Sequence, residues 1–140
     1  MNYVIDSSVA LKWFSIEEEV DLDKALKLQF EIIDLSSSIT VPDIFFYEIM
    51  NVLLKKKEFT RKDMEDALIS LYEMYPQIIH PNPEFFKKTI CLAKEENLTF
   101  YDAVFITAAI DNNCILITED LKMLKLQPKY SFIKSLREIY

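Results

Sequence analysis

The sequence predicts an α/β protein with three layers, α/β/α, in which helices cover both faces of a central, mainly parallel sheet. Short apolar runs alternate along the chain with longer amphipathic segments, as in successive β–α–β units. The uninterrupted apolar run at residues 114–117 is typical of a strand buried on both faces of such a sheet. Because 140 residues leave room for one core, we expect a single domain over residues 1–140.

Local patterns in the first half of the chain predict two strands and three helices. The helices are recognised by apolar residues at helical spacing, by the capping residues Asp6, Ser7 and Ser8, and by Pro42 and Asp43 at the start of the longest one. The strands are short apolar and β-branched runs. The expected strands are residues 3–5 and 39–41, and the expected helices are residues 9–14, 20–35 and 42–57.

The second half repeats the alternation. Thr60 and Asp63 form a variant of the capping box, which predicts a helix from residue 60 toward Pro76. Asn112 and Asn113 are expected to form the left-handed turn that glycine usually supplies. The other expected elements are strands at residues 78–79 and 114–117, helices at 83–97 and 99–111, an edge strand at 131–133, and a short terminal turn or helix at 135–140.

Composition excludes several classes of function. Average usage would give about ten glycines in a chain of this length, yet there are none. Walker-type NTPases and dinucleotide-binding folds need glycine where the backbone approaches phosphate, so both classes are excluded. Sixteen basic and 23 acidic residues leave a net charge of −7, which disfavours nonspecific binding of nucleic acid unless a metal ion or a local basic patch assists.

Cysteine and histidine are also too scarce for several sites. Cys91, Cys114 and His80 cannot complete a zinc site, and two cysteines do not make a disulfide framework. A single histidine excludes a two-histidine ribonuclease, and a Ser-His-Asp triad would have to use His80. No apolar run reaches the roughly 18 residues that cross a bilayer, and no basic leader precedes the first strand, so we expect a cytoplasmic protein without membrane contact.

Four carboxylates stand in apolar surroundings, where burial of an unpaired charge is costly. Asp6 and Asp120 each follow an expected buried strand, and Asp102 is the only charged residue between Leu98 and Ile110. Glu48 lies inside an apolar helix and has no Lys or Arg three or four residues away. Helix capping could account for each of the three aspartates taken singly, but it does not account for Glu48.

A shared cation would explain all four acids together. Mg²⁺ and Mn²⁺ prefer oxygen ligands, and a pair of such ions can activate water and polarise a phosphodiester. The ions would also bring positive charge to an acidic protein that binds a polyanion. The sequence therefore predicts metal-dependent hydrolysis of phosphodiester bonds.

The segments that contain these acids resemble those of the PIN-domain ribonucleases, in particular the VapC toxins of toxin–antitoxin systems. The order and spacing of the segments agree with that family over nearly the whole chain. The segments are residues 6–14, 47–53, 99–103 and 116–120.

The resemblance implies a ribonuclease with Mg²⁺ or Mn²⁺ as cofactor and RNA as substrate. It also implies a small cognate antitoxin, whose C-terminal segment lies over the acidic pocket, and a homodimer. In the implied site, Asp6 and Asp102 are the principal metal ligands, Glu48 and Asp120 complete the catalytic acidic pocket, and Ser8, Asn51 and Thr118 support it. The sequence alone leaves open whether Glu119 contributes beside Asp120.

Two other classes of function compete with this interpretation. One is a PIN-fold interaction module without catalytic activity, against which the presence of all four acids argues. The other is an aspartate-based phosphatase or phosphotransfer domain, in which Asp6 at a strand end would act as nucleophile. Ser8 stands where a haloacid-dehalogenase-like phosphatase would need a second aspartate, which disfavours that class.

Overall fold

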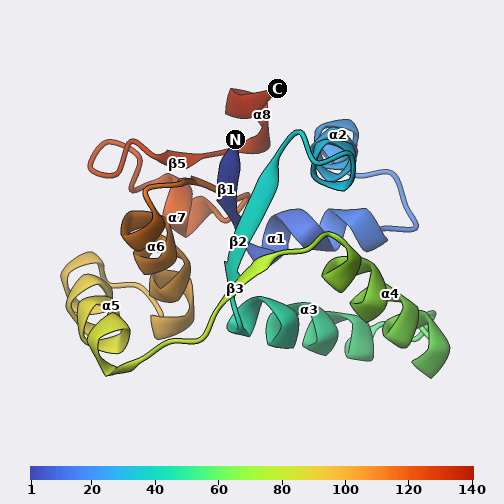
Figure 1. Ribbon diagram of the computed structural model, residues 1–140, viewed down its shortest axis with the longest axis horizontal. Helices are drawn as coiled ribbons and strands as arrows, with labels where there is room; N and C mark the ends of the chain where they lie inside the picture. The colour runs from blue at the N-terminus through green and yellow to red at the C-terminus, as the bar shows by residue number, and fades with distance from the viewer.

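The computed structural model describes all 140 residues and is built on one five-stranded sheet (Figure 1). The strands lie in the order β3-β2-β1-β4-β5, and every neighbouring pair is parallel. Their bounds are β1 Asn2–Ile5, β2 Ser38–Pro42, β3 Gln77–Ile79, β4 Ile115–Ile117 and β5 Ile133–Lys134. The predicted α/β class is confirmed, and the sheet is wholly parallel.

Helices cover both faces of this sheet. In Figure 1, α5 and α6 lie on one side, whereas α1 to α4 lie on the other. The helices are α1 Ser7–Ala10, α2 Leu22–Ile33, α3 Ile44–Lys55, α4 Arg61–Glu73, α5 Pro83–Glu96, α6 Phe100–Asn112, α7 Leu121–Leu124 and α8 Leu136–Ile139, and a 3-10 helix, η1, spans Leu11–Phe14. No helix combines the length and the apolar character that crossing a membrane requires.

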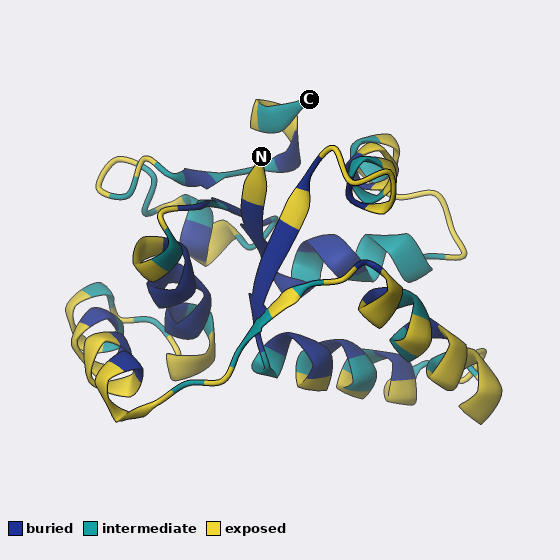
Figure 2. Cartoon of the chain, in the orientation of Figure 1, coloured by how far each residue is buried: buried dark blue, intermediate teal, exposed yellow.

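The core forms where β1, β4 and α6 meet. Val4, Ile5 and Leu116 have no exposed surface, and α6 is buried from Ala103 to Ala109 (Figure 2). Apolar residues occur on every side of α6 because this helix packs against β1, β2 and β4 as well as α5.

The topology brings several chain segments to one edge of the sheet. Because all five strands are parallel, their carboxyl ends lie together at that edge. Helix α3 begins two residues after β2 ends, so its first turns start there. Helix α6 leads back into β4 and must run antiparallel to it, which places the beginning of α6 at the same edge.

The structure differs from two of the predicted elements. The helix expected at residues 9–14 begins earlier, at Ser7, and tightens into η1 from Leu11 onward. The edge strand expected at residues 131–133 is Ile133–Lys134 instead, because the β4–β5 pairing aligns Ile117 with Lys134. Asn113 takes the predicted left-handed conformation with φ 51°, whereas Asn112 is the last residue of α6.

Candidate active site

Asp6 lies at the carboxyl end of the central strand. Strand pairing aligns Ile5 with Ile117, so the next residues, Asp6 and Thr118, lie side by side. The Asp6 residue is only 4% exposed, and its Oδ2 accepts hydrogen bonds from Ser8 Oγ at 2.7 Å and Thr118 Oγ1 at 2.9 Å. Its side chain makes no capping bond to α1, so helix capping does not explain this aspartate.

The same two hydroxyl groups join the ends of β1 and β4. Thr118 Oγ1 accepts a hydrogen bond from the backbone N–H of Asp120 at 3.0 Å, and Ser8 Oγ accepts one from the N–H of Glu119 at 3.1 Å. Each hydroxyl thus donates to the Asp6 carboxylate and accepts from the loop after β4. The two bridges hold Asp6 and Asp120 in one rigid arrangement.

The two neighbouring acids after β4 point to different partners. Asp120 Oδ1 caps α7 by accepting from the N–H groups of Lys122 at 2.8 Å and Met123 at 3.3 Å, while Oδ2 takes part in neither bond. Glu119 Oε1 accepts from the N–H of Leu136 at 2.8 Å. Glu119 therefore ties this loop to the start of α8, and Asp120 is the acid left at the carboxyl edge.

Glu48 is the one side chain whose buried polar atom lacks a partner. Its Oε1 is buried and forms no hydrogen bond, and no other buried side-chain nitrogen or oxygen of the chain is in that state. An unpartnered buried oxygen is costly, so its retention in an apolar helix calls for a partner that the chain itself does not supply. Asn51, one turn further along α3, lines a hollow of about 420 Å³ together with Glu48.

Asp102 lies in the first turn of α6, and its carboxylate is half-buried. Thr99 Oγ1 accepts a hydrogen bond from the backbone N–H of Asp102 at 3.2 Å, so Thr99 is the cap of this helix. The reciprocal bond from the Asp102 side chain, which a capping box requires, is absent.

The four acids share one electrostatic environment. The pKa of Glu48 is raised to about 7, chiefly by burial and further by the negative charges of Asp6, Asp102 and Asp120, while the Ser7 hydroxyl opposes the shift. The pKa of Asp6 is also raised, chiefly by burial and further by Asp102 and Asp120, although the Ser8 and Thr118 hydroxyls lower it in part. Four carboxylates from separate parts of the chain thus lie close enough for the charge of one to shift the pKa of another.

Asp102 belongs to the same cluster. Burial raises its pKa first, the charge of Asp120 raises it further, and Thr99 and Lys122 partly offset both effects. We call Asp6, Glu48, Asp102 and Asp120 the acidic cluster. None of the four forms an ion pair with a basic side chain.

The donor chemistry of the acidic cluster fits a hard divalent cation. All four donors are carboxylate oxygens, the ligand type of Mg²⁺ and Mn²⁺, and the free Glu48 Oε1 has an unused lone pair. No group of three or more His, Cys, Asp or Glu side chains is already gathered around a single point that could hold a metal ion. Mg²⁺ commonly uses only one or two carboxylates and keeps several waters, so the donor set suits it.

A comparison with protein families identifies the chain. Residues 3–127 match the PIN domain. The chain belongs to the PIN domain family. The resemblance to PIN domains seen in the sequence is thereby confirmed, and the matched range contains the positions of all four members of the acidic cluster. No curated protein sequence matches this PIN domain.

Solved structures share its fold at low identity. PAE2754 from Pyrobaculum aerophilum is 22% identical with a TM-score of 0.64, over 99% of this chain and 91% of that one. VapBC2 from Rickettsia felis, solved with a DNA fragment from its promoter, is 14% identical with a TM-score of 0.65, over 96% and 97%. A toxin–antitoxin complex from Klebsiella pneumoniae is 18% identical with a TM-score of 0.62, over 84% and 86%.

The supporting residues of this PIN domain fall into two groups. Ser8 and Thr118 bond directly to Asp6, as expected of residues that orient a carboxylate. Asn51 is exposed and shares only the hollow beside Glu48, without a hydrogen bond to any member of the cluster. Sequence reasoning missed Ser7, which is 7% exposed and donates from Oγ to Asp6 Oδ1 at 3.4 Å. The only sequence feature that could have indicated a role for Ser7 was its position next to Asp6, and a serine at that position is equally typical of a helix cap.

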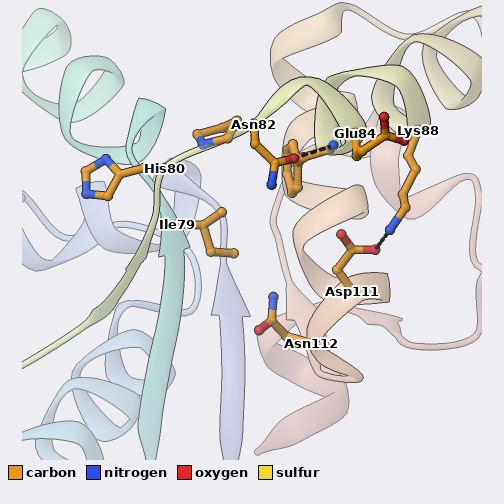
Figure 3. Close-up of a pocket in the computed structure, with 9 residues that line it drawn as sticks. Ile79, His80, Asn82, Glu84, Lys88, Asp111 and Asn112 are labelled. Carbon is orange, nitrogen blue, oxygen red and sulfur yellow. Dashed lines mark hydrogen bonds and ion pairs between the residues drawn. The ribbon is translucent and has the colours of Figure 1, made fainter.

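A second hollow, of about 310 Å³, lies away from the acidic cluster between the start of α5 and the end of α6 (Figure 3). Its polar groups have partners within the chain: Lys88 Nζ lies 2.9 Å from Asp111 Oδ1, Asn82 Oδ1 caps α5 by accepting from the N–H of Phe85, and Glu84 pairs with Lys87 outside the hollow. Figure 3 shows the His80 ring pointing away from Lys88 and Asp111. This hollow offers no unpaired donor or acceptor cluster and is not part of the candidate site.

Thr118→Val is expected to destabilise the protein by about 1–3 kcal/mol. The substitution keeps the shape of this fully buried side chain but removes the hydroxyl that donates to Asp6 and accepts from Asp120. Urea unfolding at neutral pH measures the effect. Thr118→Ser, which keeps the hydroxyl, should lose less stability than the valine variant; the reverse order would contradict a bridging role.

Proposed function

We propose that this PIN domain is a Mg²⁺- or Mn²⁺-dependent endoribonuclease that hydrolyses phosphodiester bonds of RNA. The observation that supports this most strongly is the buried, unpartnered Oε1 of Glu48 within a cluster of four carboxylates that has no ion pair. A cation at this position would offset the mutual repulsion of the carboxylates and use the free oxygen. Membership of the PIN domain family and the earlier resemblance to PIN-domain ribonucleases support the same activity.

In this proposal the chain's own residues position the cation and the substrate. Asp6 and Asp102 are the principal ligands, and Glu48 and Asp120 complete the set. Mg²⁺ or Mn²⁺, when bound, supplies the positive charge that polarises the phosphodiester and lowers the pKa of an attacking water. The hydroxyl bridges of Ser8 and Thr118 prevent Asp6 from rotating, so one oxygen orientation is maintained before substrate arrives.

We also propose that the protein is the toxin of a VapBC-type pair and that it forms a homodimer. Two structures of similar fold are described as VapBC2 from Rickettsia felis and as a toxin–antitoxin complex from Klebsiella pneumoniae. The partner would be a small antitoxin whose C-terminal segment lies over the acidic cluster. Such a segment would block RNA, so co-purified antitoxin must be removed before activity is measured.

Removal of metal tests the proposed activity. The purified chain, free of antitoxin, is incubated with a panel of single-stranded and structured RNAs in Mg²⁺, in Mn²⁺, and in EDTA. We expect internal cleavage with either metal, no cleavage in EDTA, and recovery when excess Mg²⁺ is restored, because no basic side chain forms an ion pair with the acidic cluster and the cation would supply the missing positive charge.

Two results would contradict the proposal. Cleavage by the purified chain itself that persists in EDTA would indicate metal-independent chemistry. Absence of cleavage by folded, metal-loaded protein across the panel would favour the interaction module without catalytic activity. If no RNA is cleaved, the thermal midpoint measured with and without Mg²⁺ shows whether the chain binds the ion. A protein that binds Mg²⁺ in its folded state has a higher midpoint when the ion is present.

A further inference from the structure

Two exposed tyrosines flank the acidic cluster. Tyr47 directly precedes Glu48 on α3, and Tyr101 directly precedes Asp102 on α6. Tyr47 is 70% exposed and Tyr101 is 62% exposed, and neither ring packs against another aromatic ring. Large aromatic side chains that remain exposed and unpaired beside a reactive site are suited to bind a ligand.

Both tyrosines line two neighbouring hollows. The hollow of about 420 Å³ is lined by Glu48 and Asn51 together with Ile44, Tyr47 and Tyr101. A neighbouring hollow of about 330 Å³ shares Ile44, Tyr47 and Tyr101. Its remaining lining is mostly apolar and aromatic: Asp43, His80, Pro81, Phe86, Phe100 and Val104. Because the two hollows share three lining residues, they are neighbours, and we call them together the groove: Glu48 lines one of them and most of the aromatic side chains line the other.

The chemistry of this groove favours a planar, uncharged group over a phosphate. No Lys or Arg lines it, and its histidine, His80, lies 4.0 Å from Asp43. A nucleobase presents a flat aromatic face that stacks on tyrosine regardless of sequence, whereas base-paired RNA hides these faces. The volumes fall in the range of small-ligand sites, roughly 300–1,000 Å³.

We propose that the groove between Tyr47 and Tyr101 is a subsite for an unpaired nucleobase adjacent to the phosphodiester that is cleaved. The subsite rests on the proposed ribonuclease activity, because its substrate is the same RNA. Tyr47 and Tyr101 are positioning residues: they bind the base and place the neighbouring phosphate over the acidic cluster.

The kinetic test compares Tyr47→Leu, Tyr101→Leu and the corresponding phenylalanine variants with the unmodified chain. Each leucine variant should raise KM for a short unpaired RNA by roughly 5- to 100-fold with a smaller change in kcat, because a stacking contact is lost. The phenylalanine variants keep the ring and should restore KM to within about twofold. Tyr75→Leu, at a tyrosine that is 81% exposed and lines neither hollow, is the matched control and should leave KM unchanged.

A binding test does not depend on cleavage. The Asp6→Asn chain in Mg²⁺ is titrated with a single-stranded RNA that carries 2-aminopurine, whose fluorescence falls when the base stacks. This decrease in fluorescence should be lost in the double variants that combine Asp6→Asn with Tyr47→Leu or with Tyr101→Leu. It should also be absent when the same RNA is annealed to its complement.

The outcomes separate the subsite from the activity on which it rests. Metal-dependent cleavage with unchanged KM and unchanged 2-aminopurine signal in both leucine variants would overturn the subsite and leave the ribonuclease in place. Absence of cleavage with a tyrosine-dependent 2-aminopurine signal would overturn the activity alone. A shift from dimer to monomer in sedimentation of the leucine variants would assign the groove to a second copy of the chain and overturn the proposal.

Discussion

Asp6→Asn is expected to reduce metal-dependent RNA cleavage at least about 100-fold while the protein remains folded. Partners that merely orient metal ligands contribute about 10- to 100-fold, and Asp6 is the residue that Ser8 and Thr118 orient, so its own loss should cost no less. Asparagine has the same shape, and its side-chain oxygen can accept both hydroxyl bonds. Its side-chain NH₂ can donate to Ser7 Oγ, which lies 3.4 Å from the other Asp6 oxygen.

Folding should survive because the substitution removes a repulsive charge. Burial and the charges of Asp102 and Asp120 all raise the pKa of Asp6, so the ionised form is disfavoured in the folded protein without metal. We therefore expect the thermal midpoint of Asp6→Asn in EDTA to be equal to or above that of the unmodified chain. Asp102→Asn should behave in the same way, since its pKa is raised by burial and by Asp120.

Glu119→Gln is the matched control for both variants. It changes an acid next to Asp120 in the chain, but its carboxylate faces the N–H of Leu136, and glutamine can accept the same bond. Cleavage rates measured under saturating RNA and Mg²⁺ should be unchanged in this control. A folded Asp6→Asn protein that cleaves at the unmodified rate would remove Asp6 from the mechanism.

Glu48→Gln is expected to stabilise the metal-free protein by about 1–2 kcal/mol at pH 8 and to leave it nearly unchanged at pH 5. The pKa of Glu48 rises from its usual 4.5 to about 7 in the folded state. Between these pH values the folded protein retains a proton that the unfolded chain has lost, so the free energy of unfolding falls as pH rises from 4.5 through 7. Because glutamine does not ionise, the Glu48→Gln variant does not show this fall in the free energy of unfolding.

The expected size takes the partial exposure of Glu48 into account. A fully buried group with this pKa would contribute more, but solvent screens a half-buried carboxylate. Asp6 and Asp102 also have raised pKa values, so their ionisation lowers the free energy of unfolding of the unmodified chain and of the Glu48→Gln variant as pH rises. The difference in free energy of unfolding between these two proteins therefore reports on Glu48.

Urea unfolding in EDTA at pH 5 and pH 8 measures this difference. Glu73→Gln, at an exposed position on α4, serves as the control and should show no such divergence. In Mg²⁺ at pH 8 the unmodified chain should be more stable than the Glu48→Gln variant, because the bound ion stabilises the unmodified chain more. If the free energies of unfolding of the Glu48→Gln and unmodified chains change with pH in parallel, ionisation of Glu48 does not destabilise the folded protein and the prediction is wrong.

Local sequence determined the elements and the unusual acids of this protein. Apolar runs and capping residues predict strands and helices because they act over a few residues, and most of the predicted positions agree with the structure to within two residues. Glu48 stands out in the same local way, because a carboxylate without a nearby basic residue is anomalous in any apolar helix, and its unpartnered Oε1 agrees with that expectation. Resemblance of the four acidic segments was sufficient to identify the PIN domain.

Only the tertiary structure decided how these residues act together. Asp6 and Thr118 are 112 residues apart in sequence and meet because β1 pairs with β4 in one register. The same pairing and the position of α8 turn Glu119 away while leaving Asp120 at the carboxyl edge. Tyr47 and Tyr101 line the same two hollows because α3 and α6 both begin at the carboxyl edge of the parallel sheet. Local preferences act within a few residues, whereas strand order and register arise from packing across the whole core, and those decided the geometry of the site.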